Sequence, residues 1–434
     1  MTARGLLIAV LWLCLPALAS AQLRIEIVDG VEGAMPIAVV PFAWTASAPP
    51  PEDSPDDIIR ANLARSGLFE TLPTRQMIDR PRRPAEVGFG AWRLLQVDHL
   101  LVGQVSDAAD GFGYDIEYHL IDVHTERVLL SQVMPASAGN LRFAAHRIAD
   151  AVYEALIGIP GAFATRIAYV VVHDLGGDNE MFELVVADAD GFNPQTVVRN
   201  SEPILSPAWA PDGRRIAYVS FATGRSNIIV QDLFTGRNEV VSSGRGINGA
   251  PAFSPDGRQL AVSLSRRGSP NIWVMNTDGS QARQVTEHWS ISTEPVWSKD
   301  GQHIFFTSDR AGRPHIYRVP ARGGDAERVT FDGRYNSRAT IGLDDRYLGL
   351  VHSEGNNDFR IAIFDRENER LRVLSDGRMD ESPSFAPNGS MILYATRENG
   401  RGVLAAVSAD GRVRQRLVTS DGDVREPAWS PLIR

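Results

Sequence analysis

Few residues of this sequence have the types and spacing of a catalytic, cofactor or metal site. Its nine histidines form no pair at metal-ligand spacing, and neither a Gly-x-Ser-x-Gly nor a His-Glu-x-x-His motif is present. The glycines of Gly244-Arg-Gly-Ile-Asn-Gly249 have dinucleotide-site spacing, but such a site opens a helix, and none is predicted here. Asp188-Ala-Asp190-Gly191 lacks the closing glutamate of a calcium loop. We therefore expect no catalytic residues, no cofactor and no metal.

A repeat supplies the framework that positions the remaining candidates. The stretch Ser206-Pro-Ala-Trp-Ala-Pro-Asp-Gly213 recurs, and its bulky residue returns every 44 residues, at positions 209, 253, 297, 341, 385 and 429. Proline presets one turn dihedral and glycine tolerates positive φ, so the Pro-Asp-Gly step predicts a tight turn. Short segments rich in β-branched and aromatic residues separate these turns. A period of about 40–45 residues with four short strands per unit is typical of a β-propeller blade.

The two ends of the repeat predict how the ring closes. Three strands begin at Arg166 without the opening strand that starts every other unit, and Pro427-Ala-Trp429 is an opening strand with nothing after it. We expect six blades, with the first sheet completed by the C-terminus, because this closure removes two unpaired strand edges.

The residues before the repeat follow a different pattern. Arg4, the apolar residues 6–18 and the small residues before Gln22 predict a signal peptide over residues 1–21, cleaved after Ala21. Residues 22–161 mix strands with helices, expected at residues 55–65, 91–96 and 140–156. The predicted fold is thus mixed: an N-terminal α/β (α+β) domain followed by an all-β six-bladed propeller over residues 162–434.

Composition restricts the class of partner. The formal net charge of −9 argues against nucleic acid or anionic lipid as the main partner. No later segment is long and apolar enough to predict direct membrane insertion. The only cysteine, Cys14, lies in the predicted signal peptide, so the exported chain is expected to have no disulfide. We expect a monomer.

Two parts of the chain are candidates for protein binding, and each has two interpretations. The alternating Leu23, Ile25 and Ile27 predict either a first strand of the N-terminal domain or an extended peptide that adds to a partner's sheet edge. The residues just before the first strand of each repeat unit vary in type, while the repeat around them stays constant. This pattern fits either a binding rim at one mouth of the channel or ordinary sequence drift of surface loops.

The combined motifs resemble the TolB family of the Tol-Pal envelope system across essentially the whole mature chain. The residues that carry this resemblance are Ile37-Ala-Val-Val-Pro-Phe42, Thr165-Arg-Ile-Ala-Tyr-Val170, Asn248-Gly-Ala-Pro-Ala-Phe-Ser-Pro-Asp-Gly257, Thr293-Glu-Pro295, Thr307-Ser-Asp-Arg-Ala-Gly-Arg-Pro314 and Glu426-Pro-Ala-Trp-Ser-Pro431. The resemblance implies a non-enzymatic periplasmic protein that links the lipoprotein Pal to the inner-membrane protein TolA, and has contact with other Tol-Pal components. Outer-membrane integrity and constriction of the envelope during cell division are the implied roles.

The resemblance also implies site residues. It places a Pal-binding site at Asn248, Ala250, Thr293 and Glu294, and the neighbouring rim positions extend this site to Leu205, Ser206, Ile247 and Glu381. Ile247 stands where the best-known members carry histidine. The implied TolA-binding tail comprises Gln22, Leu23, Arg24, Ile25, Glu26, Ile27, Val28, Asp29 and Gly30. The implied mechanism is a switch in which Pal at the mouth changes whether the tail reaches TolA. A hydrolase or lyase in the channel, and a generic periplasmic scaffold, stay as alternatives.

Overall fold

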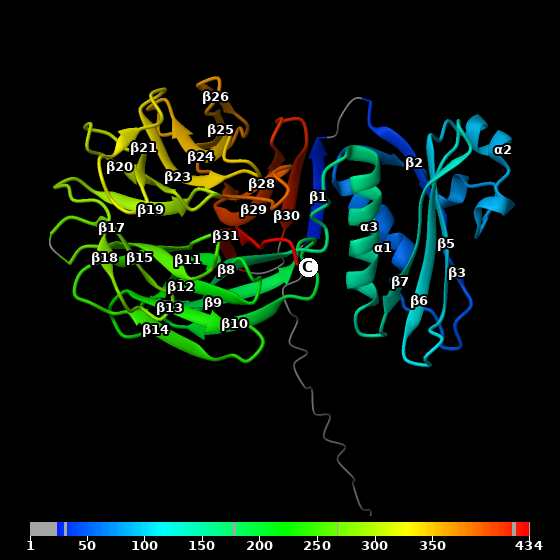
Figure 1. The fold of residues 1–434 in the computed structure, drawn as a ribbon, viewed down its shortest axis with the longest axis horizontal. Coiled ribbons are helices and arrows are strands. Elements are labelled where there is room, and N and C mark those ends of the chain that lie inside the picture. Colours follow the sequence, from blue (N-terminus) through cyan, green and yellow to red (C-terminus); the bar gives the residue numbers. More distant parts are fainter. Residues whose placement is uncertain (1–23, 30–32, 177–178, 267, 419–421, 434) are drawn as a thin grey trace, which may run out of the picture.

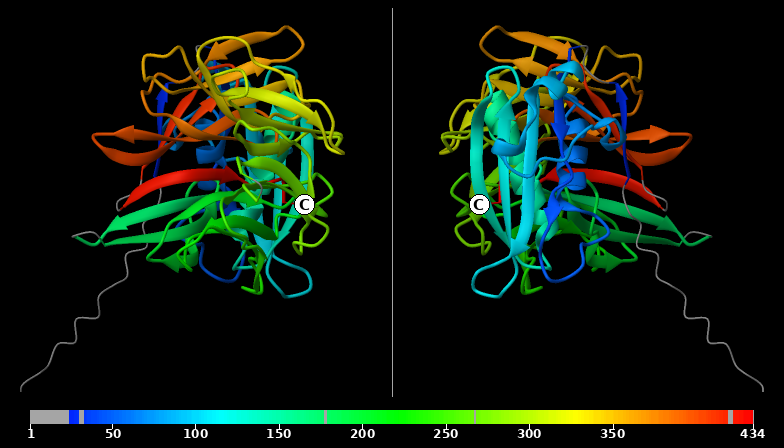
Figure 2. Two further views of the ribbon diagram at one scale, coloured as in Figure 1. Left: turned by 90° about the vertical axis from the view of Figure 1, so that its left-hand side faces the viewer. Right: turned by 90° about the vertical axis from the view of Figure 1, so that its right-hand side faces the viewer.

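The computed structural model describes residues 24–29, 33–176, 179–266, 268–418 and 422–433 (Figure 1). It has the predicted fold class, with an N-terminal domain of helices and a mixed sheet beside a six-bladed propeller. Figure 2 shows the propeller in front in one end-on view and the N-terminal sheet in front in the other. The predicted signal peptide and its cleavage site lie outside the described residues, as do Gln22, Leu23 and Gly30.

The N-terminal domain is built on one mixed sheet. Its strand order is β4-β2-β5-β6-β7, and β3 also pairs with β5. The pairs that β5 forms with β2 and β3 are parallel, whereas β5, β6 and β7 form antiparallel pairs. The strands are β2 (Met35–Val39), β3 (Ala43–Trp44), β4 (Phe69–Thr71), β5 (His99–Asp107), β6 (Tyr114–Asp122) and β7 (Arg127–Ala136).

Helices cover both faces of this sheet. Helices α1 (Pro55–Arg65) and α3 (Leu141–Ile157) lie on the face toward the propeller, and the shorter α2 (Phe89–Leu94) buries Trp92 against the other face. The Ser54 hydroxyl accepts a bond from the Asp57 amide at the start of α1, which satisfies a free N–H of the first turn. Two short 3₁₀ turns, η1 (Thr74–Gln76) and η2 (Pro84–Glu86), connect the elements. Among the described residues, no helix is long and apolar enough to cross a membrane.

The propeller consists of six antiparallel sheets, as the repeat predicts. Blade 1 contains β8 (Arg166–Asp174), β9 (Glu180–Asp188), β10 (Gln195–Asn200) and β31 (Asp423–Trp429). Blade 2 contains β11 (Ile204–Trp209), β12 (Arg215–Ser220), β13 (Asn227–Asp232) and β14 (Asn238–Ser242). Blade 3 contains β15 (Asn248–Phe253), β16 (Gln259–Leu264), β17 (Asn271–Asn276) and β18 (Arg283–Gln284).

The remaining blades repeat this arrangement. Blade 4 contains β19 (Ser292–Trp297), β20 (His303–Ser308), β21 (His315–Pro320) and β22 (Glu327–Arg328). Blade 5 contains β23 (Tyr335–Ile341), β24 (Tyr347–Ser353), β25 (Arg360–Asp365) and β26 (Arg370–Val373). Blade 6 contains β27 (Glu381–Phe385), β28 (Met391–Glu398), β29 (Arg401–Ser408) and β30 (Arg414–Val418).

The C-terminal strand closes the ring, which confirms the prediction from the ends of the repeat. Strand β31 pairs antiparallel with β8, and Trp429 lies opposite Ile167. The Ser430 amide donates to the Arg166 carbonyl at 2.8 Å, and the Trp429 indole donates to the Thr165 hydroxyl at 2.8 Å. The ring therefore closes with a strand from each end of the propeller sequence.

The N-terminal strand has a different partner from the one that the simpler interpretation predicts. Strand β1 (Arg24–Asp29) does not join the sheet of the N-terminal domain, where that interpretation placed it. It pairs antiparallel with β30 and forms a fifth strand at the outer edge of blade 6 (Figure 1). The physical reason is that β30 offers a free edge of backbone donors and acceptors, which any extended segment of suitable length satisfies.

Candidate protein-binding mouth of the propeller

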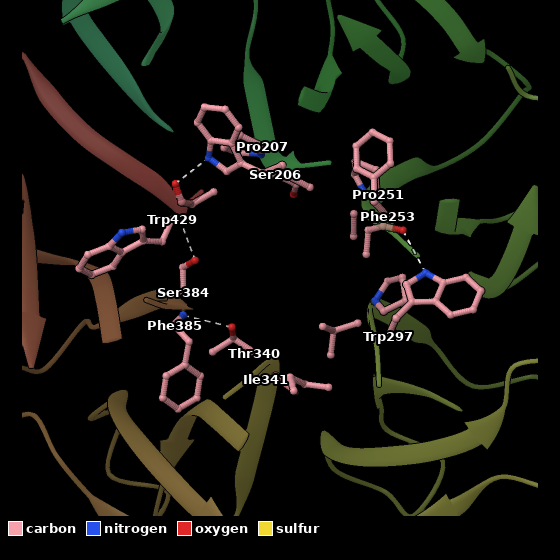
Figure 3. A pocket seen from close by; sticks show the side chains of 18 of the residues that line it. Ser206, Pro207, Pro251, Phe253, Trp297, Thr340, Ile341, Ser384, Phe385 and Trp429 are labelled. Atoms are coloured by element: carbon pink, nitrogen blue, oxygen red, sulfur yellow. Dashed lines mark hydrogen bonds between the residues drawn. The ribbon is translucent and has the colours of Figure 1, made fainter. Parts of the chain in front are cut away.

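The inner strands of the six blades surround a channel of about 480 Å³ (Figure 3). Hydrogen bonds join neighbouring blades around it. The Trp297 indole donates to the Ala252 carbonyl at 3.1 Å, and the Trp209 indole donates to the Ala428 carbonyl at 3.0 Å. These rings come from the bulky position of the repeat, so the residues that define the repeat also fix the spacing of the blades.

One residue per blade holds a left-handed backbone where the inner strand lines the channel. At each of these places the pairing with the next strand shifts register, as in a β-bulge. A left-handed non-glycine residue is uncommon, so six in equivalent positions mark a built feature of the ring. These residues, with φ between 47° and 56°, are Ser206, Ala250, Glu294, Arg338, Ser382 and Glu426.

Two of the channel carboxylates are held by one arginine. Arg338 donates to Glu426 at 2.5 Å and to the Ser382 hydroxyl at 2.7 Å, and its Nε lies 3.6 Å from Glu294. Burial opposes charge on the Arg338 guanidinium, but Glu426 and Glu294 outweigh it and hold the arginine pKa above its usual value. Burial likewise tends to raise the Glu426 pKa, and Arg338 lowers it overall. The two carboxylates therefore act as partners of Arg338, which disfavours either of them as the acid or base of a channel enzyme.

The structure brings the predicted Pal-site residues to one end of the propeller, but these residues differ in how far they are exposed to solvent. Leu205, Ile247 and Glu381 are exposed, and Thr293 is half-buried. Glu294 is only 27% exposed and accepts a bond from the Thr307 hydroxyl at 2.8 Å, so it is not the freely exposed carboxylate that a rim position suggests. The half-buried Ser206 and Ala250 belong to the left-handed set described above.

Asn248 is a predicted site residue whose side chain makes hydrogen bonds within the protein. It is 1% exposed, and its amide nitrogen donates to the Gly244 carbonyl at 2.8 Å and to the Gly246 carbonyl at 3.2 Å. Its oxygen accepts from the Ser242 hydroxyl at 2.7 Å. We conclude that Asn248 shapes the loop that presents Ile247.

Several exposed apolar residues at this mouth were missed by sequence reasoning. Ile291 and Met379 are 47% and 49% exposed, and they stand 44 and 132 residues after Ile247, which is 51% exposed. Trp289 is 80% exposed, with His288 stacked on it at 5.3 Å. In the 44-residue alignment, Ile291 and Met379 stand two positions before the predicted rim residues Thr293 and Glu381. Large exposed apolar side chains that gather on one face are typical of a protein-binding surface.

A separate cluster joins the two domains and contains the group that best matches a metal site. Ligand atoms of His146, Asp188 and Asp190 lie within 4.8 Å of one another. Asn62 donates to His146 Nδ1 at 2.8 Å while its oxygen accepts from Arg65 at 3.1 Å, so His146 Nε2 carries the proton and offers no lone pair. Arg142 also binds Asp190 directly. The donor set therefore fits an ion-pair cluster between domains and does not fit a metal.

Comparisons with known proteins address the family of the whole chain. The model of the TolB amino-terminal domain matches residues 23–129, and that of the TolB β-propeller domain matches residues 153–433. The chain belongs to the TolB family. A family member named Tol-Pal system protein TolB, from Xanthomonas oryzae pv. oryzae strain KACC10331, is 53% identical over 427 residues, covering 98% of this chain and 97% of the relative.

Other family members give the same result. The protein of the same name from Xanthomonas axonopodis pv. citri strain 306 is 53% identical over 424 residues, which cover 97% of this chain and 96% of the relative. The crystal structure of TolB from Acinetobacter baumannii is 39% identical and has a TM-score of 0.87. That match covers 95% of this chain and all of the solved chain, so the family relationship extends to the arrangement of both domains.

Proposed function

We propose that this chain is a non-enzymatic periplasmic component of the Tol-Pal system that binds Pal through the propeller mouth and TolA through its N-terminal tail. Membership of the TolB family and the names of the relatives support the assignment to the Tol-Pal system. The chain would thereby contribute to outer-membrane integrity and to envelope constriction during division.

The shape of the mouth supports its part in the proposal. Ile247, Ile291 and Met379 expose apolar surface on loops that lead into the inner strands, and Leu205 exposes it near the start of β11. The N-terminal domain contacts the opposite end of the propeller, where the Pro160 carbonyl accepts a bond from the turn residue Asn388 at 2.9 Å. A partner of protein size can thus dock over the mouth without displacing the N-terminal domain.

The observation that carries the TolA part is the pairing of β1 with β30. The backbone of the tail is extended and bonded along one edge, so it cannot add to a partner's sheet through that edge at the same time. Arg24 lies opposite Val418, at the end of blade 6 nearest the mouth. A ligand at the mouth is therefore close to the start of the tail, which gives a route by which Pal occupancy changes tail release.

A reversible cross-link tests this mutual exclusion. Glu26 lies opposite the exposed Arg416, and paired residues of antiparallel strands have the Cα separation that a disulfide needs. Glu26→Cys combined with Arg416→Cys should bind TolA when reduced and lose that binding when oxidised, while Pal binding is retained in both states. Calorimetry with the soluble part of each partner measures this, and each single-cysteine variant serves as the control.

A shortened chain separates the tail proposal from its alternatives. A mature protein that starts at Gly33 should fold, bind Pal and fail to bind TolA, because the tail contributes contacts to its partner. Unchanged TolA affinity in either experiment contradicts the tail assignment. Failure of the intact mature protein to bind Pal would contradict the mouth assignment and leave the generic scaffold.

A further inference from the structure

A hollow opens between blades 2 and 3, beside the channel. It has a volume of about 650 Å³ and adjoins the channel, with which it shares Ser206 and Ala250 as lining residues. Leu205, Phe221 and Ile247 give it apolar walls, and Arg225 and Arg245 supply its charged groups. None of the residues that line it is acidic. The hollow therefore combines apolar surface with two positive charges at one position on the ring.

Within the part of the chain that the structure describes, no acidic side chain neutralises the charges of this hollow. Arg225 and Arg245 are exposed, and neither forms an ion pair with any residue that the structure describes. The three mouth loops at residues 221–226, 243–247 and 265–270 contain no aspartate or glutamate. The third loop adds Arg266, whose guanidinium lies 5.3 Å from the Trp273 ring centre. A basic arc thus covers blades 2 and 3 in a chain whose net charge is negative.

The opposite side of the mouth, at blades 5 and 6, carries exposed residues of both signs. Glu354 on blade 5 is 72% exposed. Between blades 5 and 6, Arg378 is 87% exposed and Asp376 is paired with Arg414 at 2.6 Å. The backbone frame of the mouth repeats from blade to blade, so shape alone distinguishes poorly between docking orientations related by rotation about the channel axis. The charge difference across the mouth makes these orientations unequal in energy.

We propose that the hollow between blades 2 and 3 receives an acidic segment of the protein docked at the mouth, and so fixes the rotational orientation of that protein on the ring. This inference rests on the proposed function, in which the docked protein is Pal. Guanidinium groups bind carboxylates through paired hydrogen bonds, and the apolar walls exclude water from those bonds. A flat anionic membrane over the whole mouth would also meet the exposed Glu354, so a basic arc confined to blades 2 and 3 favours a protein partner.

Charge reversal at the hollow tests the inference. The change is Arg225→Glu with Arg245→Glu in the full mature chain, and the probe is the soluble domain of Pal. We expect the association rate to fall by at least about tenfold at 50 mM salt, because complementary charge of this kind raises association rates by roughly 10- to 1000-fold. The loss should shrink at 500 mM salt, since exposed charges are then screened. Surface plasmon resonance measures the association rate at both salt concentrations.

A matched control separates the effect of where the charge is changed from the effect of the total charge. Arg237 is exposed on the β13–β14 turn of blade 2, at the end of the propeller away from the mouth, so Arg237→Glu combined with Arg258→Glu makes the same charge change on that face. This control should bind Pal like the unmodified chain. Equal binding by the hollow variant and the unmodified chain overturns the inference while leaving the proposed function intact. Loss of binding to phosphatidylglycerol vesicles, with Pal binding unchanged, would assign the arc to a membrane instead.

Discussion

The left-handed residues that ring the channel limit what each position can carry. A non-glycine residue in this conformation costs roughly 1–2 kcal/mol, and β-branched side chains tolerate it least. Ala250, at a φ of 47°, would therefore be strained as valine even with space around it. Neighbouring positions with ordinary backbone, such as Thr293, are better places to enlarge a side chain when partner contact is tested.

Arg338 is the residue whose loss should disturb the mouth most. Arg338→Met keeps the aliphatic stem but leaves Glu426 and Glu294 without their cation. Removing one partner of a buried pair costs about 3–5 kcal/mol, and the partial exposure of these groups (25% for Arg338, 14% for Glu426) should bring the cost below that range. Urea unfolding measures the difference. The matched change Arg237→Met on the exposed turn should stay within about 0.5 kcal/mol, and equal stability of both variants contradicts the role given to Arg338.

At the scale of the element, β31 and β1 are both held by backbone pairing at the edge of a sheet, but the consequences differ. Both are strands that complete a sheet begun elsewhere in the chain. Strand β31 lies innermost in blade 1 and buries Val424 and Ala428, so its removal exposes core. Strand β1 lies outermost on blade 6, where only one edge is bonded. An inner strand is therefore structural, whereas an outer strand can be released without opening the ring.

Truncation of the C-terminus tests this difference. Deleting residues 426–434 removes the partly buried Trp429, the buried Ala428 and their pairing with β8. Loss of one fully buried aromatic side chain costs roughly 3–5 kcal/mol, and we expect the combined loss here to reach that range. At about 2–4 °C per kcal/mol, the melting temperature should fall by at least about 6 °C. Deleting only residues 432–434 removes the bond from Arg147 to the Ile433 carbonyl and should change little. Equal melting of the two truncated forms would rule out closure by β31.

At the scale of the molecule, the cluster around His146 connects the two domains. His146 and Arg142 project from α3, Asn62 and Arg65 from α1, and the turn after β9 supplies Asp190 and the Ala189 carbonyl, which accepts a bond from Arg65 at 3.0 Å. Burial lowers the pKa of His146 to about 4. Burial, reinforced by Asp190, raises the pKa of Asp188 to about 6. The interface between domains therefore contains groups with pKa values of about 4 and about 6.

The shift at His146 predicts an acid response with a definite sign. Because the folded-state pKa of His146 is depressed, the unfolded chain binds the extra proton, and stability is lost as the pH falls from 6.5 toward 4. Asp188 acts in the opposite sense, since its raised pKa makes folding less costly as the pH falls. His146→Asn removes only the first effect. Relative to the unmodified chain, this variant should gain about 2 kcal/mol between pH 7.5 and pH 5.

Denaturant unfolding at the two pH values measures that gain. Asn offers an oxygen where His146 Nδ1 accepts the bond from Asn62, so the variant keeps the contact between helices α1 and α3. A stability difference between the two proteins that does not change with pH would show that His146 is not the group that responds.

The sequence by itself determined the features that depend on local chemistry repeated along the chain. The 44-residue period and the Pro-Asp-Gly turns predicted six blades, and the unmatched strand at Trp429 predicted closure with the strand at Arg166. Proline and two acidic residues in the first turn predicted the helix at residues 55–65, which α1 matches. These signals are readable because turn and helix-start geometry is fixed by adjacent residues.

Only the tertiary structure decided which distant groups meet. An alternating strand specifies two faces but not which free edge it joins, so the pairing of β1 with β30 could not be read from residues 24–29. Arg338 lies 44 residues from Glu294 and 88 from Glu426, and Asn62 lies 84 residues from His146. Closure of the ring and docking of the domains bring these groups together, and a linear sequence does not encode those contacts locally.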